Sequence, residues 1–409
     1  MKFVTANVQQ VTERLARASA PLRGEGRGWF ILFMAVGWFL TLGARYLIPA
    51  VLPAIKTDFG VGNTGAGLVV TVIWLTYGAL QYPAGALTDR LGERLMLTAS
   101  AVLAAVSLVG FAVIPTYLLF LVAAAAFGTG TGLFGPARGL ALSKTYDEHE
   151  GAAFGVVLAA GSIGAAVLPF AATLLTGMYG WRFAVASMFP LFVLVAIGLW
   201  WAVPDDLGSG AESAPLLGSF RTTIRCLRTG RVAFAVAGIV VMLFVMQGLT
   251  AFFVTYLTSV KGLGGGIAGG LFALLFLSGS GFQVWAGRMA DVYGYRLVLV
   301  GVGAFSVIPL VLFPFASDLI GIVVVTVLIG IRLALGSLTN AYIIGSLPAE
   351  GRGAVWGSIR TGFFAVGSMG SYVVGVIADF GMFDEAMYFL AGLTVIGTVL
   401  YALLPDDRP

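Results

Sequence analysis

The sequence predicts an all-α membrane protein in which twelve transmembrane helices form two pseudo-symmetric six-helix bundles. Three observations lead to this prediction: the composition is very apolar, apolar runs of about 20 residues recur along the chain, and the second half of the sequence resembles the first. Of the 409 residues, 59% are hydrophobic and 10% are charged, with a mean hydropathy of +0.98. A soluble domain carries about 25% charged residues, so this composition argues against a water-soluble fold.

Apolar segments long enough to cross a bilayer divide the chain into twelve predicted spans. They cover residues 29–53, 64–86, 94–114, 117–142, 152–177, 182–202, 231–259, 266–287, 296–315, 319–346, 354–379 and 386–404. Lys and Arg concentrate in the N-terminal segment and in every second connection, which by the positive-inside rule places both termini in the cytoplasm. Arg138 and Arg360, near the cytoplasmic ends of the fourth and eleventh spans, are interpreted as anchors of this kind.

A polar segment between the sixth and seventh spans marks the boundary between two domains. We expect a cytoplasmic N-terminal segment at 1–27, a six-helix bundle at 28–203, a cytoplasmic linker at 204–230, a second six-helix bundle at 231–405 and a short tail at 406–409. The Gly, Ser, Asp and Glu content of the linker is typical of a connection rather than of a helix in the membrane.

Two segments 202 positions apart carry the repeat that relates the two halves. Residues 81–97 read QYPAGALTDRLGERLML, and residues 283–299 read QVWAGRMADVYGYRLVL. The two copies align without a gap, and the offset extends to further glycines, among them Gly128 and Gly330. Internal repeats of this kind are typical of transporters built from two similar halves.

The first copy contains the motif GALTDRLGERL, between the second and third predicted spans. It resembles the loop motif of the major facilitator superfamily, G-x-L-x-D-R-x-G-R-K/R. The matching residues are Gly85, Leu87, Asp89, Arg90, Gly92 and Arg94. The second copy retains Gly287, Asp291, Gly294 and Arg296. Two positions depart from the pattern, Glu93 and Val292, where the family has basic residues.

The resemblance covers nearly the whole chain and implies a transporter whose two bundles rock about a central site. It also implies that the motif residues latch the bundles together in one conformation and release them in the other. The residues themselves allow a simpler interpretation, in which Gly92 and Gly294 make tight turns with positive φ and the basic residues are anchors.

Two arginines interrupt predicted spans, where an ionisable side chain is costly and usually functional. Arg45 lies in the first span, and Arg332 lies in the tenth, about 21 Å along the helix from Asp318 at 1.5 Å per residue. In the fold that the resemblance implies, both spans line the central cavity. Guanidinium stays charged and binds carboxylate or phosphate through a fork of donors, so the pair predicts an anionic solute. Alternatively, Arg45 extends to the outer interface and Arg332 binds backbone carbonyls of a neighbouring helix.

Four further residues complete the predicted substrate-binding set. Gln247 in the seventh span is the repeat counterpart of Arg45, and Asn340 lies about two turns after Arg332. Tyr77 and Tyr256 are aromatic residues of the second and seventh spans for which contact with lipid or a neighbouring helix is the alternative to contact with solute.

No Asp or Glu lies deep in a predicted span, although proton-coupled carriers commonly use a buried carboxylate. Uniport, exchange of one anion for another and symport with a protonated solute all remain open, with Asp379 as the reserve candidate for proton coupling. Drug-exporting relatives often carry an Arg early in span 4 and G-x-x-x-G-P-x-x-G-G in span 5. Residues 123–127 contain no Arg and span 5 reads GSIGAAVLPF, which disfavours drug export.

We therefore expect a transporter of the plasma membrane (the inner membrane of a prokaryote) that moves a small organic anion, either a carboxylate or a phosphorylated or phosphonate compound. An exporter of drugs or other neutral or cationic amphiphiles is the alternative. A single Cys and a single His argue against metal clusters, and without intramembrane acids or bases we expect no enzyme activity, metal or cofactor. The net charge of +4 reflects loop anchors rather than nucleic-acid binding, and a monomer would hold a complete site.

Overall fold

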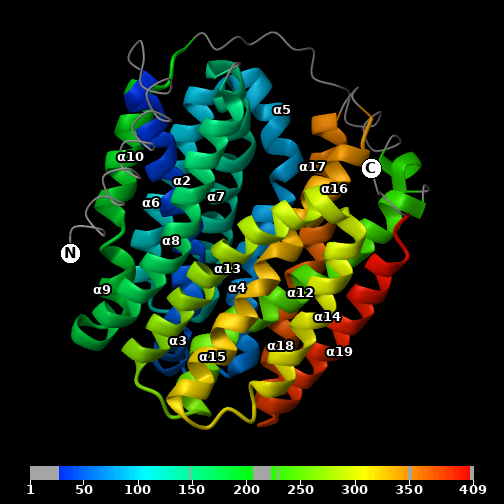
Figure 1. Cartoon of the computed structure of the whole chain (residues 1–409). Coiled ribbons are helices and arrows are strands. Elements are labelled where there is room, and N and C mark those ends of the chain that lie inside the picture. Colours follow the sequence, from blue (N-terminus) through cyan, green and yellow to red (C-terminus); the bar gives the residue numbers. More distant parts are fainter. Residues whose placement is uncertain (1–26, 147–148, 206–222, 228–229, 349–351, 406–409) are drawn as a thin grey trace, which may run out of the picture.

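The computed structural model describes residues 27–146, 149–205, 223–227, 230–348 and 352–405, and every regular element in these residues is a helix (Figure 1). The all-α fold class is therefore confirmed. Three predicted segments lie largely or wholly outside the described residues: the N-terminal segment, the linker and the C-terminal tail.

The first bundle begins with α2 (Arg27–Ala50) and ends with α10 (Phe189–Ala202). The helices between them are α3 (Leu52–Phe59), α4 (Asn63–Ala79), α5 (Gln81–Leu91), α6 (Glu93–Val113), α7 (Tyr117–Thr145), α8 (Glu150–Tyr179) and α9 (Trp181–Ala186). Within this bundle α2 packs along α8, and α6 packs along α7.

The second bundle begins with α12 (Gly230–Ser259) and ends with α19 (Phe383–Ala402). The elements between them are α13 (Gly265–Tyr293), α14 (Tyr295–Leu312), α15 (Leu319–Ile329), the 3-10 segment η3 (Gly330–Arg332), α16 (Leu333–Ser346), α17 (Arg352–Gly367) and α18 (Met369–Asp379). Here α12 packs against α18 and α19, and α14 packs against α19.

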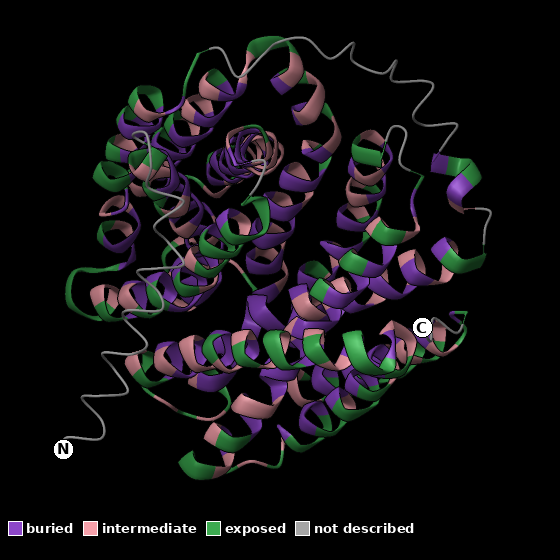
Figure 2. Ribbon diagram, turned by 45° about the horizontal axis from the view of Figure 1, so that its top comes forward, coloured by how far each residue is buried: buried purple, intermediate pink, exposed green. Residues whose placement is uncertain are grey.

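Eleven helices of the described chain are long and apolar enough to cross a membrane, and a pair bent by 120°, α3 with α4, raises the number to twelve. α4 continues into α5 after the single residue Leu80, whose backbone is helical, so α4 and α5 together correspond to the second predicted span. Large apolar side chains such as Leu118 (72% exposed) and Ile320 (77% exposed) face outward. Figure 2 shows the exposed residues along the outer sides of the helices. Exposed apolar surface on this scale suits contact with lipid.

The sequence repeat also relates packing contacts in the two bundles. An added Cβ at Gly128 in α7 would collide with the backbone carbonyl of Ile73, and one at Gly330 would collide with that of Leu275. Ile73 and Leu275 are themselves 202 positions apart in the sequence. Each copy of the repeat therefore brings the same two helices into close contact within its own bundle, as small residues do in membrane helices.

The two motif loops share one backbone conformation. Gly92 and Gly294 have φ angles of 83° and 85°, which side chains disfavour, so the predicted tight turns are confirmed. One helix earlier, Nε2 of Gln81 donates to a carbonyl of α7 (3.5 Å), and Nε2 of Gln283 donates to a carbonyl of α16 (3.1 Å). Both glutamines thus tie the motif helix to the corresponding neighbour in its bundle.

The two bundles touch closely where α4 meets α18. An added Cβ at Gly67 would collide with the Ser371 carbonyl, so the two backbones are in contact. Oγ1 of Thr71 donates to the Ser368 carbonyl (2.9 Å) and accepts from the Tyr372 N–H (3.1 Å). In an uninterrupted α-helix that carbonyl and that N–H would bond to each other. Thr71 is therefore inserted into the ladder of the opposite bundle, at the break between α17 and α18.

A carboxylate closes the same end of the molecule. Asp379, the last residue of α18, accepts hydrogen bonds from the backbone N–H groups of Asn63 (2.6 Å) and Thr64 (2.8 Å) at the start of α4. These N–H groups have no partner within their own helix, and the helix dipole favours a negative charge there. We call this region, from Asp379 to Thr71, the closed end; it is the lower end in Figure 1.

Candidate solute-binding site

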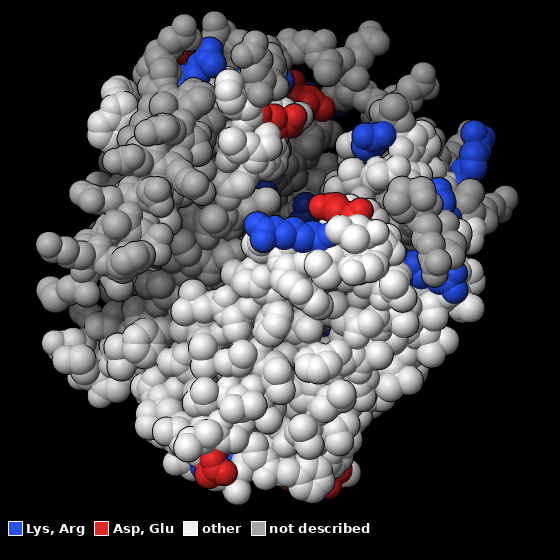
Figure 3. All heavy atoms as spheres, in the orientation of Figure 1, with Lys and Arg blue, Asp and Glu red and all other residues white. Residues whose placement is uncertain are grey.

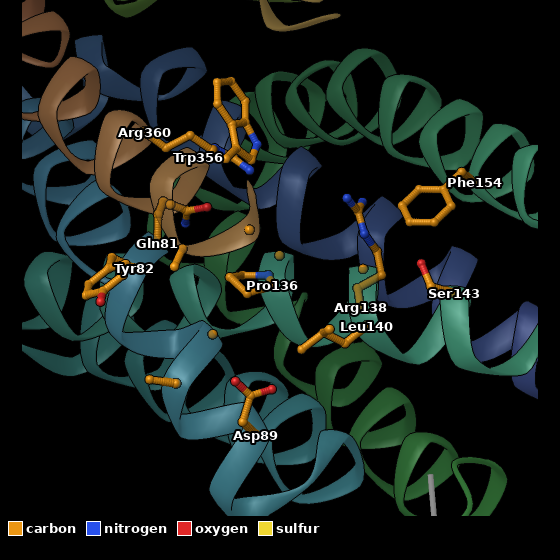
Figure 4. A pocket seen from close by; sticks show the side chains of 17 residues that line it. Gln81, Tyr82, Asp89, Pro136, Arg138, Leu140, Ser143, Phe154, Trp356 and Arg360 are labelled. Carbon is orange, nitrogen blue, oxygen red and sulfur yellow. The ribbon is translucent and has the colours of Figure 1, made fainter. Parts of the chain in front are cut away.

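A pocket of about 450 Å³ lies between the bundles, away from the closed end. Its walls come from α5, α7 and α8 of the first bundle and from α17 of the second (Figure 4). Figure 3 shows the surface hollowed at this end with charged side chains around the hollow, whereas the surface below is almost free of charge. We call this the open end. A pocket of this volume suits a small molecule.

Two arginines reach this pocket from opposite bundles. Figure 4 shows Arg138 on α7 and Arg360 on α17, with both side chains directed toward the space between the helices. Cζ of Arg138 lies 3.9 Å from the ring centroid of Trp38, a cation–π contact. Nη2 of Arg360 donates to the Tyr77 hydroxyl, 3.3 Å away across the bundle interface. Both guanidiniums are therefore held in place by aromatic side chains.

A third guanidinium, that of Arg45 in α2, lies behind Tyr77 and is 1% exposed. Its Cζ is 3.9 Å from the Tyr77 ring centroid, 4.8 Å from that of Trp74 and 5.4 Å from that of Trp38. Nε of Arg45 donates to the Thr41 carbonyl one turn earlier (3.2 Å). Arg45 thus does not line the pocket wall, but it contacts the ring of Tyr77, whose hydroxyl accepts from Arg360, and further aromatic rings surround its guanidinium.

We call Arg45, Arg138 and Arg360 the arginine cluster. Arg45 and Arg360 contact Tyr77, and Arg138 contacts the ring of Trp38, as Arg45 also does. In the part of the chain that the structure describes, none of the three forms an ion pair. Four of their donor atoms are buried and have no hydrogen-bond partner among the described residues: Nη1 of Arg45, Nε and Nη1 of Arg138 and Nε of Arg360. Uncompensated charge and free, forked donors are the features that carboxylate or phosphate oxygens require.

The structure separates the two arginines that the sequence singled out. Arg332 is 4% exposed and lies inside the second bundle, where Nη1 donates to Oγ1 of Thr394 in α19 (3.0 Å) and Nη2 contacts Sδ of Met242 in α12 (3.8 Å). It does not line the pocket, contrary to our expectation. The reason is helical geometry: Gly330 packs against α13, and a residue two positions later points to the opposite side of the helix, toward α19.

The other predicted substrate-binding residues also lie in different parts of the structure. Tyr77 is central to the arginine cluster, whereas Tyr256 donates to Asp384 of its own bundle (2.6 Å). Gln247 is 1% exposed; its carbonyl accepts from Ser371, and its Nε2 is buried without a partner among the described residues. Oδ1 of Asn340 is likewise buried without such a partner, and Asn340 is not on the pocket wall.

Arg138 and Arg360 are the pocket residues that sequence reasoning missed, because both were taken for anchors at helix ends. α7 continues to Thr145 and α17 begins at Arg352, so the two arginines lie seven and eight residues inside their helices. At 1.5 Å per residue that is about 10–12 Å from the helix end, too deep for an interfacial anchor. The predicted spans ended at residue 142 and began at residue 354, so they placed the two arginines only four and six residues from a span end.

The motif residues of the first copy lie near the open end, and the ion pairs that the structure gives them join them to the start of the linker and to α7 of the same bundle. Arg94 pairs with Asp205, and its Cζ lies 4.3 Å from the Trp200 ring. Glu93, the departure from the family pattern, pairs with Lys144 (2.6 Å). Of the residues expected to latch the bundles, Asp89 and Gly85 line the pocket. The latch itself stays a prediction for Gly85, Asp89, Arg90, Gly92, Arg94, Gly287, Asp291, Gly294 and Arg296.

Two helical bundles related by a sequence repeat, with a pocket between them that two arginines line, are typical of membrane transporters built from two repeats. The sequence model of the Major Facilitator Superfamily matches residues 34–371, and the chain belongs to this superfamily. It is therefore a multi-pass membrane protein of a transporter family, as its sequence motif implied.

Among curated proteins, the chain is 28% identical over 378 residues to the fosmidomycin resistance protein of Escherichia coli (strain K12), covering 88% of this chain and 89% of that protein. It is 23% identical over 397 residues to the quinolone resistance protein NorA of Staphylococcus aureus (strain COL), covering 93% and 97%. Among solved structures, it is similar to a bacterial homologue of the human lysosomal transporter Spinster in an inward-facing, occupied conformation, with a TM-score of 0.77, 15% identity and coverage of 92% and 96%.

Proposed function

We propose that this transporter carries a small organic anion across the plasma membrane and binds it between the bundles at the arginine cluster. One observation carries the proposal: three guanidiniums from both bundles gather around Tyr77 and Trp38, and none of them forms an ion pair among the described residues. A buried charge without a partner is costly unless a ligand supplies the opposite charge. An anion that bonds to Arg138 and Arg360 would also join the two bundles.

Within the anions, a phosphonate or phosphate ester is favoured over a simple carboxylate. Its three oxygens can accept from several guanidiniums at once, and Arg binds such groups through paired donors. The likeness to the fosmidomycin resistance protein supports this class, because fosmidomycin is a phosphonate. The aromatic rings of Trp38 and Trp356 beside the arginines would contact the carbon chain of the solute.

The side of the membrane follows from the positive-inside rule, which assigns the open end to the cytoplasm. The structure then corresponds to an inward-facing state, with the closed end toward the outside. The same assignment supports cytoplasmic termini, because the first described residue, Arg27, and the end of α19 lie at the open end in Figure 1. The motif residues around Asp89 would then latch the bundles when the open end closes.

Export of an amphiphilic drug is the second candidate, and the likeness to NorA favours it. The aromatic residues Trp38, Trp74, Tyr77 and Phe364 would suit a neutral amphiphile as well as an organic anion. A cationic drug fits poorly, because three guanidiniums would repel it.

Uptake into proteoliposomes tests the proposal. Purified protein should transport labelled fosmidomycin, and unlabelled phosphonates should compete better than monocarboxylates or ethidium, a cationic amphiphile. Arg138→Gln and Arg360→Gln should each lower the uptake about tenfold or more, since a hydrogen bond to a charged group contributes about 1.5–3 kcal/mol. Arg225→Gln, an exposed arginine outside the bundles, is the matched control. Transport of ethidium unaffected by either pocket substitution would instead establish the drug exporter.

A further inference from the structure

We propose that this protein is an anion exchanger: it reorients across the membrane with an anion bound and returns empty much more slowly. The proposal rests on the proposed function, because it assumes that the arginine cluster is where the anion binds. It goes further by specifying the transport mode, which the sequence left open among uniport, exchange and symport.

Closing the open end with no anion bound costs free energy. Arg45 is 1% exposed and Arg138 is 9% exposed even in the state that is open to one side. The third positive charge, on Arg360, belongs to the other bundle, so closing the open end must move all three charges into a common space without bulk water. Like charges repel more strongly as the local dielectric falls, and each charge loses hydration. Closure without an anion is therefore strongly disfavoured.

The protein groups that could replace the anion are carboxylates. Among the described acidic residues, Asp89 lines the pocket near the motif loop, about two helical turns from Gln81. Glu93 pairs with Lys144 at the open end. Asp379 is bonded to the start of α4 at the closed end, on the far side of the cluster. None of these carboxylates contacts the arginine cluster in the structure.

A proton cannot replace the anion either. Proton-coupled carriers return empty by protonating a buried carboxylate, which removes its charge. A guanidinium keeps its proton at any physiological pH, so the charge of this cluster cannot be switched off. A dianion, by contrast, offsets two of the three positive charges. The bound anion is thus the group that permits closure, and an anion is needed on each side for a complete cycle.

Counterflow in proteoliposomes tests this. Vesicles contain either unlabelled fosmidomycin, inorganic phosphate or only the potassium chloride that is also outside, with valinomycin to hold the membrane potential at zero. We expect labelled fosmidomycin to enter vesicles loaded with fosmidomycin or phosphate at least about tenfold faster than unloaded vesicles, and an imposed pH gradient to leave that ratio unchanged. Equal entry into unloaded vesicles, or a pH gradient that replaces the internal anion, would refute exchange and leave the proposed function intact. If fosmidomycin neither bound nor entered under any condition, both proposals would fail.

A variant separates exchange from a general loss of binding. Arg138→Gln removes one of the three charges, so it should raise net entry relative to exchange and lower the exchange-to-net ratio about threefold or more. Loss of a binding contact alone would slow both processes and leave the ratio unchanged, which would contradict the proposal. Because both rates come from the same preparation, the ratio does not depend on how much protein folds. Arg225→Gln should keep the ratio of the unaltered protein.

Discussion

The two ends of the interface between the bundles are built from different chemistry. At the closed end, glycine lets two backbones touch and Thr71 forms neutral hydrogen bonds with the opposite bundle. Toward the open end, Arg138 and Arg360 face a pocket and form no ion pair among the described residues. The polar groups at the closed end hydrogen-bond to one another, whereas the arginines toward the open end have no ion-pair partner among the described residues.

This difference explains how one interface can open at one end and close at the other. Neutral hydrogen bonds contribute about 1 kcal/mol each, so the closed end can separate at modest cost. Groups released there find new partners, because the Ser368 carbonyl and the Tyr372 N–H can bond to each other once Thr71 withdraws. The open end needs an additional negative charge before it can close. Four substitutions test this contrast, and they follow from the largest expected effect to the smallest.

Arg45→Gln should have the largest effect on transport. It removes the charge behind Tyr77 and the cation–π contacts that hold the ring, and the loss of about 1.5–3 kcal/mol corresponds to roughly a 10–100-fold lower uptake efficiency. Uptake of labelled fosmidomycin measures it, with Arg225→Gln as control. Arg45→Lys should recover part of the activity. Uptake within threefold of that of the unaltered protein would show that Arg45 has no role in transport.

Thr71→Val should loosen the closed end. Val has the shape of Thr but cannot form the two hydrogen bonds, so we expect about 1–2 kcal/mol less stability of the closed end and roughly 5–30-fold faster opening to the outside. The labelling rate of a cysteine at position 371, Ser371→Cys in a Cys226→Ser background, reports this because Ser371 is buried there. Thr71→Ser, which keeps the hydroxyl, is the control. An unchanged rate would mean that Thr71 does not hold the bundles together.

Asp379→Asn should have a smaller effect of the same kind. The carboxylate lies at the exposed rim, where a charge at a helix N-terminus contributes about 0.3–1 kcal/mol, so labelling at position 371 should rise about two- to fivefold. Asp318→Asn is a matched control, because Asp318 caps α15 of its own bundle through Gly321 and joins no second bundle. Loss of all transport in Asp379→Asn would instead support the role in proton coupling that the sequence suggested.

Arg332→Met should leave transport within about threefold, because Arg332 contacts Thr394 and Met242 inside one bundle. Replacing a buried charge by an apolar side chain of similar length is often neutral or stabilising, so the melting temperature of the solubilised protein should stay the same or rise. Arg332→Ala should lower it, since a cavity forms. A tenfold loss of uptake in Arg332→Met with an unchanged melting temperature would indicate that Arg332 binds the solute.

The fold was predictable because the features that indicate it follow one another along the sequence and need no knowledge of distant contacts. Apolar length marks each span, and the glycine pattern marks its partners: Gly128 and Gly330 occupy equivalent contacts, as their 202-residue offset suggested. The turns at Gly92 and Gly294 followed from the motif. Breaks within spans were less visible. The interruption between α17 and α18 involves Thr71, nearly 300 residues away in the sequence. The sequence around the interruption gives no indication of that contact.

By itself, the sequence determined the class of protein and the two-bundle architecture, because apolar length and the internal repeat are properties of the chain alone. Tertiary structure decided which way each side chain points. A helix turns about 100° per residue. The number of residues between a packing glycine and an arginine therefore decides whether the arginine faces the pocket or the interior of its own bundle. That is why Arg138 and Arg360 line the pocket, while Arg332 faces Thr394 inside its own bundle.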